Sequence, residues 1–271
     1  MNMTNERIFF FFRKHSNLTV VTVGKRAKMV AVSCVTGALL MVVMSITVYL
    51  ILTPETVKIR GEKFLVGEEY YYTLNNETDT VTLNQIINPK QENVTLPDNI
   101  DGYTVDTIGT VADKPVLYMP KRLGLFENNK FIKTVIVPDS IQYIERETFM
   151  ESTVERVTIE GNINEICQAT FSGCANLEEV VFKGNVSIIG NYAFSSTGLK
   201  EITLPNGVER IEFGAFWYNE KLEKIVIGDK VTHIEDNAFN NSPNLTIFGS
   251  KDSYVEKYAK EHNIPFEEFV I

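Results

Sequence analysis

The side chains that most often act in catalysis or metal binding are few in this chain, and they do not form a recognisable motif. Only three histidines occur, His15, His233 and His262, and none has another histidine or a cysteine at the spacing of metal ligands. The HExxH, CxxC, GxSxG, GxGxxG and P-loop patterns are all missing from the sequence. We therefore predict no catalytic residue, no metal site and no cofactor, and we expect the protein not to be an enzyme.

Five phenylalanines recur at intervals of 22 or 23 residues and mark an internal repeat: Phe149, Phe171, Phe194, Phe216 and Phe239. An isoleucine precedes each of them by five residues, and an Ile or Val lies three residues before that isoleucine. Each unit opens with two apolar residues separated by one position, such as Ile202 and Leu204. Chance does not keep these columns in step over five units, so the sequence predicts a solenoid.

Within a unit, the alternating apolar pair predicts a short strand with one buried face. Turn-forming residues such as Asn206 and Gly207 follow it. The next leg, Val208 to Ile211, is too short for an ordinary helix, and we interpret it as extended or as a 3₁₀ turn. Because one unit cannot cover its own apolar face, we expect a mostly-β stack with one parallel sheet and one strand per repeat.

The segment Leu199–Phe216 reads Leu-Lys-Glu-Ile-Thr-Leu-Pro-Asn-Gly-Val-Glu-Arg-Ile-Glu-Phe-Gly-Ala-Phe and resembles the BspA-type, or Treponema-type, leucine-rich repeat. The same pattern recurs at 132–149, 177–194 and 222–239, and the resemblance covers roughly residues 94–271. It implies a leucine-rich-repeat solenoid. Members of this family are mostly bacterial, and some protist, surface proteins that bind host proteins or other cells. Recognition of another macromolecule is therefore the function that the resemblance implies.

Two cysteines lie within the repeats, Cys167 and Cys174. A disulfide is one alternative in an oxidising exterior. Cys174, however, suits the inward-packing loop column of the family pattern, and Cys167 takes a column otherwise held by Glu or Gly. We expect two free thiols. The carboxylates at 145, 212 and 235 also recur once per repeat, and we interpret them as a solvated face.

Both ends of a solenoid need caps. At the C-terminus, Ser253-Tyr-Val-Glu256 is a capping box that predicts a helix to about His262, within a cap over residues 250–271. The leucine-rich repeats occupy 132–249. Before them, residues 68–131 are expected to form a β cap and an atypical first repeat, which is opened by an insertion near Gly109–Leu123.

An apolar segment near the N-terminus predicts a membrane anchor. The 26 residues from Met29 to Pro54 carry no charge, enough for a transmembrane helix over 29–53. The tail before it, residues 1–28, carries a net charge of +5 and is expected in the cytoplasm. Residues 54–67 would form a short stalk. A cleaved signal peptide is the competing interpretation, but the apolar stretch is long and no small-residue cleavage site stands near its end.

The total charge of −9 leaves −14 for the part expected outside the cell. An acidic exterior disfavours nucleic acid and anionic lipid head groups, so we expect a protein partner and no small-molecule substrate. Three surfaces are candidates for contact. One is a row of outward residues in the strands with an acidic centre, and the second is an aromatic loop; together these two comprise Ile136, Thr158, Val181, Thr203, Val226, Glu178, Glu179, Glu201, Trp217 and Tyr218. The third is the apolar loop Val116–Pro120 within the insertion.

Each of the first two candidates also has a purely structural interpretation. β-Branched residues suit strands, alternating charges pair along ladders, and Trp217 would pack over a neighbouring loop. Taken together, the sequence predicts a membrane-anchored, outward-facing protein that recognises another protein without catalysis, such as a surface adhesin. The alternative is an envelope scaffold that holds a partner near the membrane, which the short stalk favours. An enzyme would need a site in residues 68–131, where none is visible.

Overall fold

The computed structural model describes residues 70–75, 77–86, 90–109 and 124–269, together with short strands at 14–15, 18–19, 55–59 and 62–66. The chain divides into two compact units, Met1–Thr56 and Val57–Ile271. In the first unit, β1 (Lys14–His15) pairs antiparallel with β2 (Leu18–Thr19). No helix in the described part of the chain is long and apolar enough to span a membrane. The transmembrane helix expected over 29–53 lies outside the described residues.

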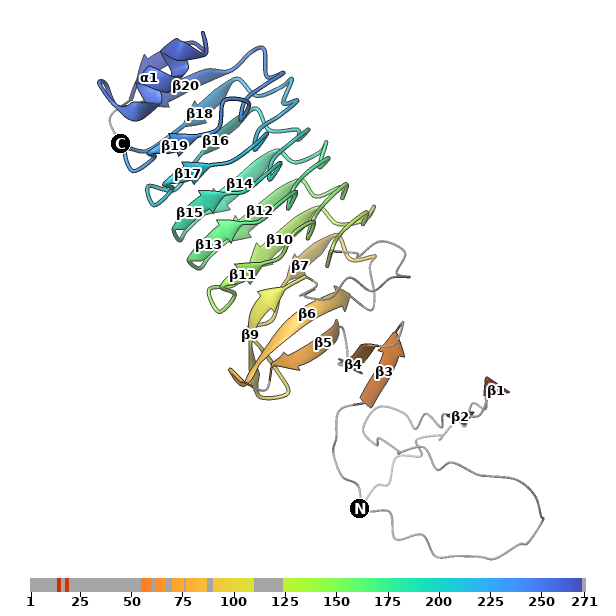
Figure 1. The fold of residues 1–271 in the computed structure, drawn as a ribbon. Coiled ribbons are helices and arrows are strands. Elements are labelled where there is room, and N and C mark those ends of the chain that lie inside the picture. The colour runs from red at the N-terminus through yellow and green to blue at the C-terminus, as the bar shows by residue number, and fades with distance from the viewer. Residues whose placement is uncertain are drawn as a thin grey trace, which may run out of the picture. The chain divides into compact units, whose positions relative to one another are not determined.

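The second unit is a mostly-β parallel solenoid of about seven turns with one helix near the C-terminus (Figure 1). The first leg of each coil forms a strand, and these strands are β7 (Asn93–Thr95), β10 (Thr134–Val137), β12 (Arg156–Ile159), β14 (Glu179–Phe182), β16 (Glu201–Thr203), β18 (Lys224–Val226), β20 (Thr246–Gly249) and β21 (Phe266–Glu268). They pair in parallel in two groups, β7 to β14 and β16 to β21, so the sheet is interrupted between β14 and β16.

The second leg of each coil is also a strand, which corrects the prediction of one strand per repeat. These strands are β9 (Tyr103–Ile108), β11 (Tyr143–Ile144), β13 (Ile163–Ile166), β15 (Val186–Ile189), β17 (Arg210–Ile211) and β19 (His233–Ile234). They form a second parallel sheet, with the inward isoleucines in register, as Ile189 is with Ile211 and Ile211 with Ile234. Several are only two residues long, too short for an alternation pattern to reveal them.

The N-terminal end of the second sheet is antiparallel. It contains β3 (Glu55–Ile59), β4 (Glu62–Val66), β5 (Tyr70–Asn75) and β6 (Thr80–Ile86), with β8 (Asn99–Ile100) paired to β9. The hairpin β5–β6 continues into the solenoid because β6 pairs in parallel with β9. Residues 54–67, predicted as a stalk, therefore contain two strands, of which β4 pairs with β5. The predicted insertion is described only at Gly109, since residues 110–123 lie outside the described part.

A single file of stacked rings forms the centre of the solenoid, as the repeat spacing predicts. Its members are Phe126, Phe149, Phe171, Phe194, Phe216 and Phe239. Neighbouring ring centroids lie 4.9 to 5.4 Å apart. Each of the first five also donates its N–H to a carbonyl of the following coil, as Phe194 does to Ala215 over 2.8 Å. Burial of such a side chain contributes roughly 1.5–3 kcal/mol, and here it depends on the neighbouring coil.

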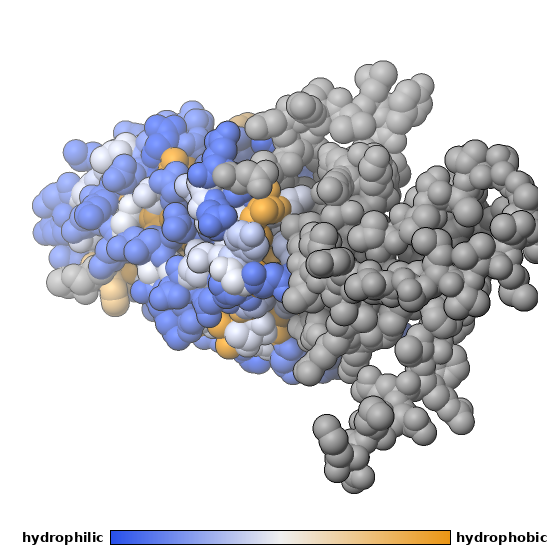
Figure 2. Space-filling model, turned by 90° about the horizontal axis from the view of Figure 1, so that it is seen from below, coloured by the Kyte–Doolittle hydropathy of each residue, from blue (hydrophilic) through white to orange (hydrophobic). Residues whose placement is uncertain are grey.

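The C-terminal helix α1 (Tyr254–Glu261) closes this file. Ser253 caps it by accepting the N–H of Glu256, and the Glu256 carboxylate accepts the N–H of Asp252. The apolar stripe of the helix is buried, and the ring of Tyr258 meets Phe239 edge-on at 6.0 Å. The helix predicted from the capping box is thus confirmed. On the face visible in Figure 2, the coloured surface is mainly hydrophilic, with small separate apolar patches.

Candidate functional site

The row of outward strand residues is only partly exposed. Ile136, Thr158 and Val181 stand opposite one another across β10, β12 and β14, as the repeat pattern requires. The first two are half-buried, and Val181 is exposed. Thr203, on β16, is exposed but lies beyond the interruption in the sheet. The structure therefore groups these residues in two sections rather than in one continuous ladder.

Val226 corrects the prediction of an exposed row, because this side chain is only 3% exposed. Its partners in register are Thr203 on one side and Phe248 on the other. Phe248 presents a large ring where the other coils present a β-branched residue, and Lys224 extends over that ring at 5.1 Å. The larger neighbour accounts for the burial of Val226, which belongs to the interior of the sheet rather than to a binding face.

The predicted acidic centre is partly balanced by an arginine. Glu178 and Glu179 are exposed, and both approach the same guanidinium, with Arg156 Nη2 3.3 Å from Glu178 and Nε 3.5 Å from Glu179. Such exposed ion pairs contribute little to stability. They do cancel charge locally, so this part of the first sheet is less acidic than the sequence suggests.

A shallow groove of about 1120 Å³ crosses the starts of the first-leg strands. It spans the interruption between β14 and β16, and its charged lining comprises Glu155, Glu178, Lys200, Glu201, Lys221, Glu223 and Lys224. Two of the predicted residues, Glu178 and Glu201, line it, whereas Glu179 does not. The mixture of signs suits a polar segment of a partner rather than a ligand of one charge.

The predicted aromatic loop belongs to a larger group, here called the aromatic cluster: Tyr192, Phe213, Trp217 and Tyr218. The Trp217 ring lies 5.6 Å from Tyr192 of the preceding coil and 4.9 Å from Tyr218, measured between centroids. Phe213 meets Tyr192 edge-on at 5.2 Å. Trp217 packs against Tyr192 of the preceding coil, while its neighbour Tyr218 remains at the surface.

Exposure within the aromatic cluster is uneven. Phe213 is 41% exposed and Tyr218 is 51% exposed. Trp217 is half-buried, and its indole N–H is enclosed with no hydrogen-bond partner among the described residues. Tyr192 and Phe213 were not among the site residues predicted from the sequence. A signal was available for Phe213, since the same column in other coils holds the polar residues Arg146, Gln168, Asn191 and Asp236.

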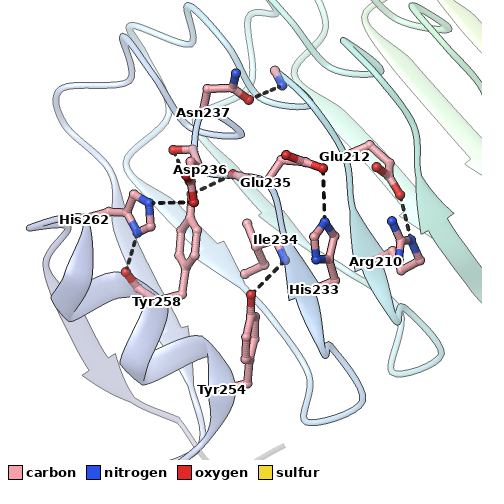
Figure 3. Close-up of polar contacts among 11 residues, drawn as sticks. Arg210, Glu212, His233, Ile234, Glu235, Asp236, Asn237, Tyr254, Tyr258 and His262 are labelled. Atoms are coloured by element: carbon pink, nitrogen blue, oxygen red, sulfur yellow. Dashed lines mark hydrogen bonds and ion pairs between the residues drawn. The ribbon is translucent and has the colours of Figure 1, made fainter.

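A polar group on the second sheet was also missed. Glu212, His233 and Glu235 come from adjacent coils, and their carboxylate and imidazole ligand atoms all lie within 4.8 Å of one another. Figure 3 shows these side chains beside Arg210 on the outer side of β17 and β19. Spacing along the chain could not reveal them, because a full coil separates Glu212 from His233.

Both cysteines of the repeats are free thiols, as predicted. Burial raises the pKa of the Cys174 thiol to about 11 and that of Cys167 to about 12. Cys174 donates from Sγ to the carbonyl of Phe149 over 3.0 Å, so it is part of the interior hydrogen bonding. A nucleophilic cysteine needs a lowered pKa, and neither thiol has one.

The family of the repeats follows from a comparison with known sequence families. Residues 123–246 match six copies of the BspA type leucine rich repeat region. The array is a BspA-type leucine-rich-repeat region. This repeat family is typically non-catalytic, and leucine-rich-repeat domains generally mediate protein–protein interaction. A search of curated proteins finds no match to the chain.

Solved bacterial structures share the fold of this BspA-type array. The leucine-rich repeat protein of T. pallidum is 22% identical, with a TM-score of 0.60 over 74% of this chain and 97% of that protein. A leucine-rich repeat protein from Bacteroides ovatus is also 22% identical, with a TM-score of 0.50 over 69% of this chain. The match spans only 55% of the B. ovatus chain. At these identities the likeness concerns the fold alone.

Proposed function

We propose that this BspA-type protein is a non-catalytic recognition protein that binds another protein through its aromatic cluster. The observation that carries the proposal is the exposure of Phe213 and Tyr218, at 41% and 51%. The file of phenylalanines fills the core without these two residues, so the exposed parts of their rings are not needed to fill it. Aromatic side chains are enriched at protein interfaces and often contribute the largest share of binding energy.

The rigidity of the solenoid supports the proposal. Phe213 and Trp217 lie on one coil and Tyr192 on the preceding coil, and the coils are fixed relative to each other by backbone hydrogen bonds such as Phe194 N–H to Ala215 O. The aromatic cluster is therefore preorganised, and its side chains would lose little conformational entropy when a partner binds. The groove lined by Glu178 and Glu201 offers polar contacts of both signs as a second part of the interface.

Capture by the full chain tests this proposal. We would compare wild type with the double variant Phe213→Ser/Tyr218→Ser and with Tyr143→Ser, which removes an aromatic residue 52% exposed outside the cluster. Each would be incubated with extracts of bacterial surfaces and of host cells, and retained proteins quantified by mass spectrometry. We expect a protein retained by wild type and Tyr143→Ser and lost with the double variant. Equal retention by all three would remove the cluster from the interface.

We further propose that residues 29–53 hold the repeat domain at the outer side of a membrane, as a surface adhesin would be held. The support is in the sequence, in the uncharged segment and the +5 tail before it. Protease added to intact cells should then digest the repeats. Digestion only after lysis would place the repeats on the inner side, and an intact mass that starts beyond Thr53 in the membrane fraction would remove the anchor.

A scaffold within the cell envelope is the second candidate. The observation that favours it is the short interval between residue 53 and β3, which starts at Glu55. A domain so close to the anchor cannot reach far from the bilayer. In a thick-walled cell, protection of the repeats from protease until the wall is removed would favour this scaffold over an adhesin.

A further inference from the structure

The outer side of β17 and β19 carries four polar side chains in a two-by-two array. The strands are parallel, with Arg210 opposite His233 and Ile211 opposite Ile234. Both isoleucines point into the core. The residues on either side of them therefore point outward, and the register places Glu212 next to Glu235. Figure 3 shows the array with an ion pair, Arg210 Nε to Glu212 Oε1 at 2.7 Å, and a hydrogen-bond contact, His233 Nε2 to Glu235 Oε1 at 3.2 Å.

Three members of this array are metal-ligand types. An imidazole nitrogen suits divalent transition metals such as Zn²⁺ and Co²⁺, and Zn²⁺ also accepts carboxylate oxygens as ligands. The donors lie within 4.8 Å of one another. Metal–ligand bonds of about 2 Å in a tetrahedron separate the donors by about 3.3 Å. The longest separation therefore has to shorten by roughly 1.5 Å at most, which side-chain rotation can provide.

The three side chains are free enough to make that adjustment. Glu212 is 21%, His233 39% and Glu235 42% exposed in the side chain. Their backbones, in contrast, are held by the sheet: Glu212 donates to the Ile189 carbonyl and Glu235 to the Ile211 carbonyl. The backbone positions are thus fixed while the side chains can adjust. Three protein ligands would leave the fourth coordination position of a metal ion open to water or to a partner.

The electrostatic surroundings favour a cation. Glu165 lies two coils before Glu212, and a Cβ at the intervening Gly190 would come within 2.8 Å of its Oε1. Burial, and then the charge of Glu212, raise the pKa of Glu165. Glu165 interacts electrostatically with Glu212 and Arg146, and Arg210 interacts with Glu212 and Glu235. Among these five side chains, three carboxylates stand against two guanidiniums.

We propose that Glu212, His233 and Glu235 form a surface site for a divalent transition metal, with Zn²⁺ as the expected ion. The imidazole ligand selects against Ca²⁺ and Mg²⁺, which prefer oxygen ligands alone. Arg210 competes with the metal for Glu212, because its guanidinium forms an ion pair with this carboxylate. The ion would join two successive coils beside the C-terminal helix, whose Tyr254 hydroxyl accepts the Ile234 N–H from β19.

Calorimetric titration of the full-length protein with ZnCl2, CoCl2 and CaCl2 tests the site. We expect Zn²⁺ and Co²⁺ to bind and Ca²⁺ not to compete. His233→Gln and Glu235→Gln should each weaken Zn²⁺ binding by at least about tenfold, a loss that even outer-shell substitutions reach. Arg210→Met should tighten binding, because it releases Glu212. The matched control is His262→Gln, which alters the half-buried histidine of the C-terminal cap, 3.5 Å from Asp236 Oδ1.

Two spectroscopic readouts separate this site from binding elsewhere on the chain. Co²⁺ should produce visible d–d absorption in wild type and in His262→Gln, and this absorption should be lost in His233→Gln. Zn²⁺ should raise the Tm of wild type but not that of His233→Gln, whereas circular dichroism checks that each variant is folded. Binding that is unchanged in His233→Gln and Glu235→Gln, or that Arg210→Met fails to tighten, would overturn the proposal.

Discussion

The ring of Tyr192 lies directly against the backbone of Gly214, one coil away. A Cβ at Gly214 would come within 2.8 Å of Cε1 of Tyr192, and the backbone there has a positive φ of 60°. Glu147, Ala169 and Tyr192 hold the same column in earlier coils with φ of 55 to 60°. The backbone conformation alone therefore does not demand glycine. Gly214 makes room for the ring, which in turn supports Trp217.

Gly214→Ala is expected to destabilise the protein by more than about 2 kcal/mol, because a left-handed residue with a Cβ costs about 1–2 kcal/mol and the displaced ring adds to it. Urea denaturation would measure the loss, and Trp217, the only tryptophan, would report the displacement by fluorescence. In a Tyr192→Ala background the same substitution should cost less. Gly102→Ala, at φ 90° with no atom within 4 Å of the added Cβ, is the control for backbone strain alone.

The file of phenylalanines predicts a position-dependent response to truncation. Phe194 lies in its middle, between Phe171 at 5.1 Å and Phe216 at 5.3 Å. Phe194→Ala should cost about 3–5 kcal/mol and weaken coupling between the halves of the array. Hydrogen exchange should then rise in the coils on both sides. Phe239→Ala, at the end of the file, should instead raise exchange mainly in the last coil and α1. Identical exchange patterns would contradict nearest-neighbour stacking.

The stacking core could be predicted from the sequence because every coil repeats the same burial requirement. Phe149 through Phe239 recur at the period of the coil, and the capping box at Ser253 is a local hydrogen-bonding pattern. Both the period of the phenylalanines and the capping box can be recognised from residue types at fixed spacings along the chain. The second sheet escaped prediction because strands such as Tyr143–Ile144 are held by the adjacent coils rather than by their own alternation.

The surface could be predicted only in part, because contacts across coils depend on which side chains happen to align. Trp217 and Tyr218 stood out by composition, whereas Tyr192 joins them only through stacking of the coils. Val226 is buried because its neighbour in register is Phe248, a residue that departs from the repeat pattern in the last coil. His233 and Glu212 also come together through the stacking of adjacent coils. Their proximity can be deduced only once the register of the second sheet is known.

Asn219 is expected to be the most sensitive polar residue of the interior. It is fully buried; its Oδ1 accepts from the N–H and hydroxyl of Thr197, and its Nδ2 donates to the Phe194 carbonyl over 2.8 Å. Asn219→Ala would leave these buried groups without hydrogen-bond partners, at a cost of about 1–3 kcal/mol each. We therefore expect the free energy of unfolding, measured by urea denaturation, to fall by at least about 2 kcal/mol. Asn244→Ala removes an exposed bond to the Glu220 carbonyl and should cost less than about 0.5 kcal/mol. Equal losses would show that burial does not set the cost.

The raised thiol pKa values predict a loss of stability at alkaline pH. Burial raises the pKa of Cys174 from 9.0 to about 11. The folded protein therefore keeps a proton that the unfolded chain releases above about pH 9. Stability should be constant below about pH 8 and then fall by at most about 1.4 kcal/mol per pH unit for each such thiol.

Urea denaturation between pH 8 and about 9 would measure this slope, because the unfolded chain begins to release the protons of Tyr72 and Tyr258, whose pKa values burial also raises, only as the pH approaches about 10. Cys174→Ser keeps a donor for the Phe149 carbonyl and removes the titrating thiol, so its slope should be shallower than that of wild type. Cys167→Ser should reduce the slope in the same way, because burial raises that thiol's pKa to about 12. A slope unaffected by both substitutions would mean that other groups cause the alkaline loss.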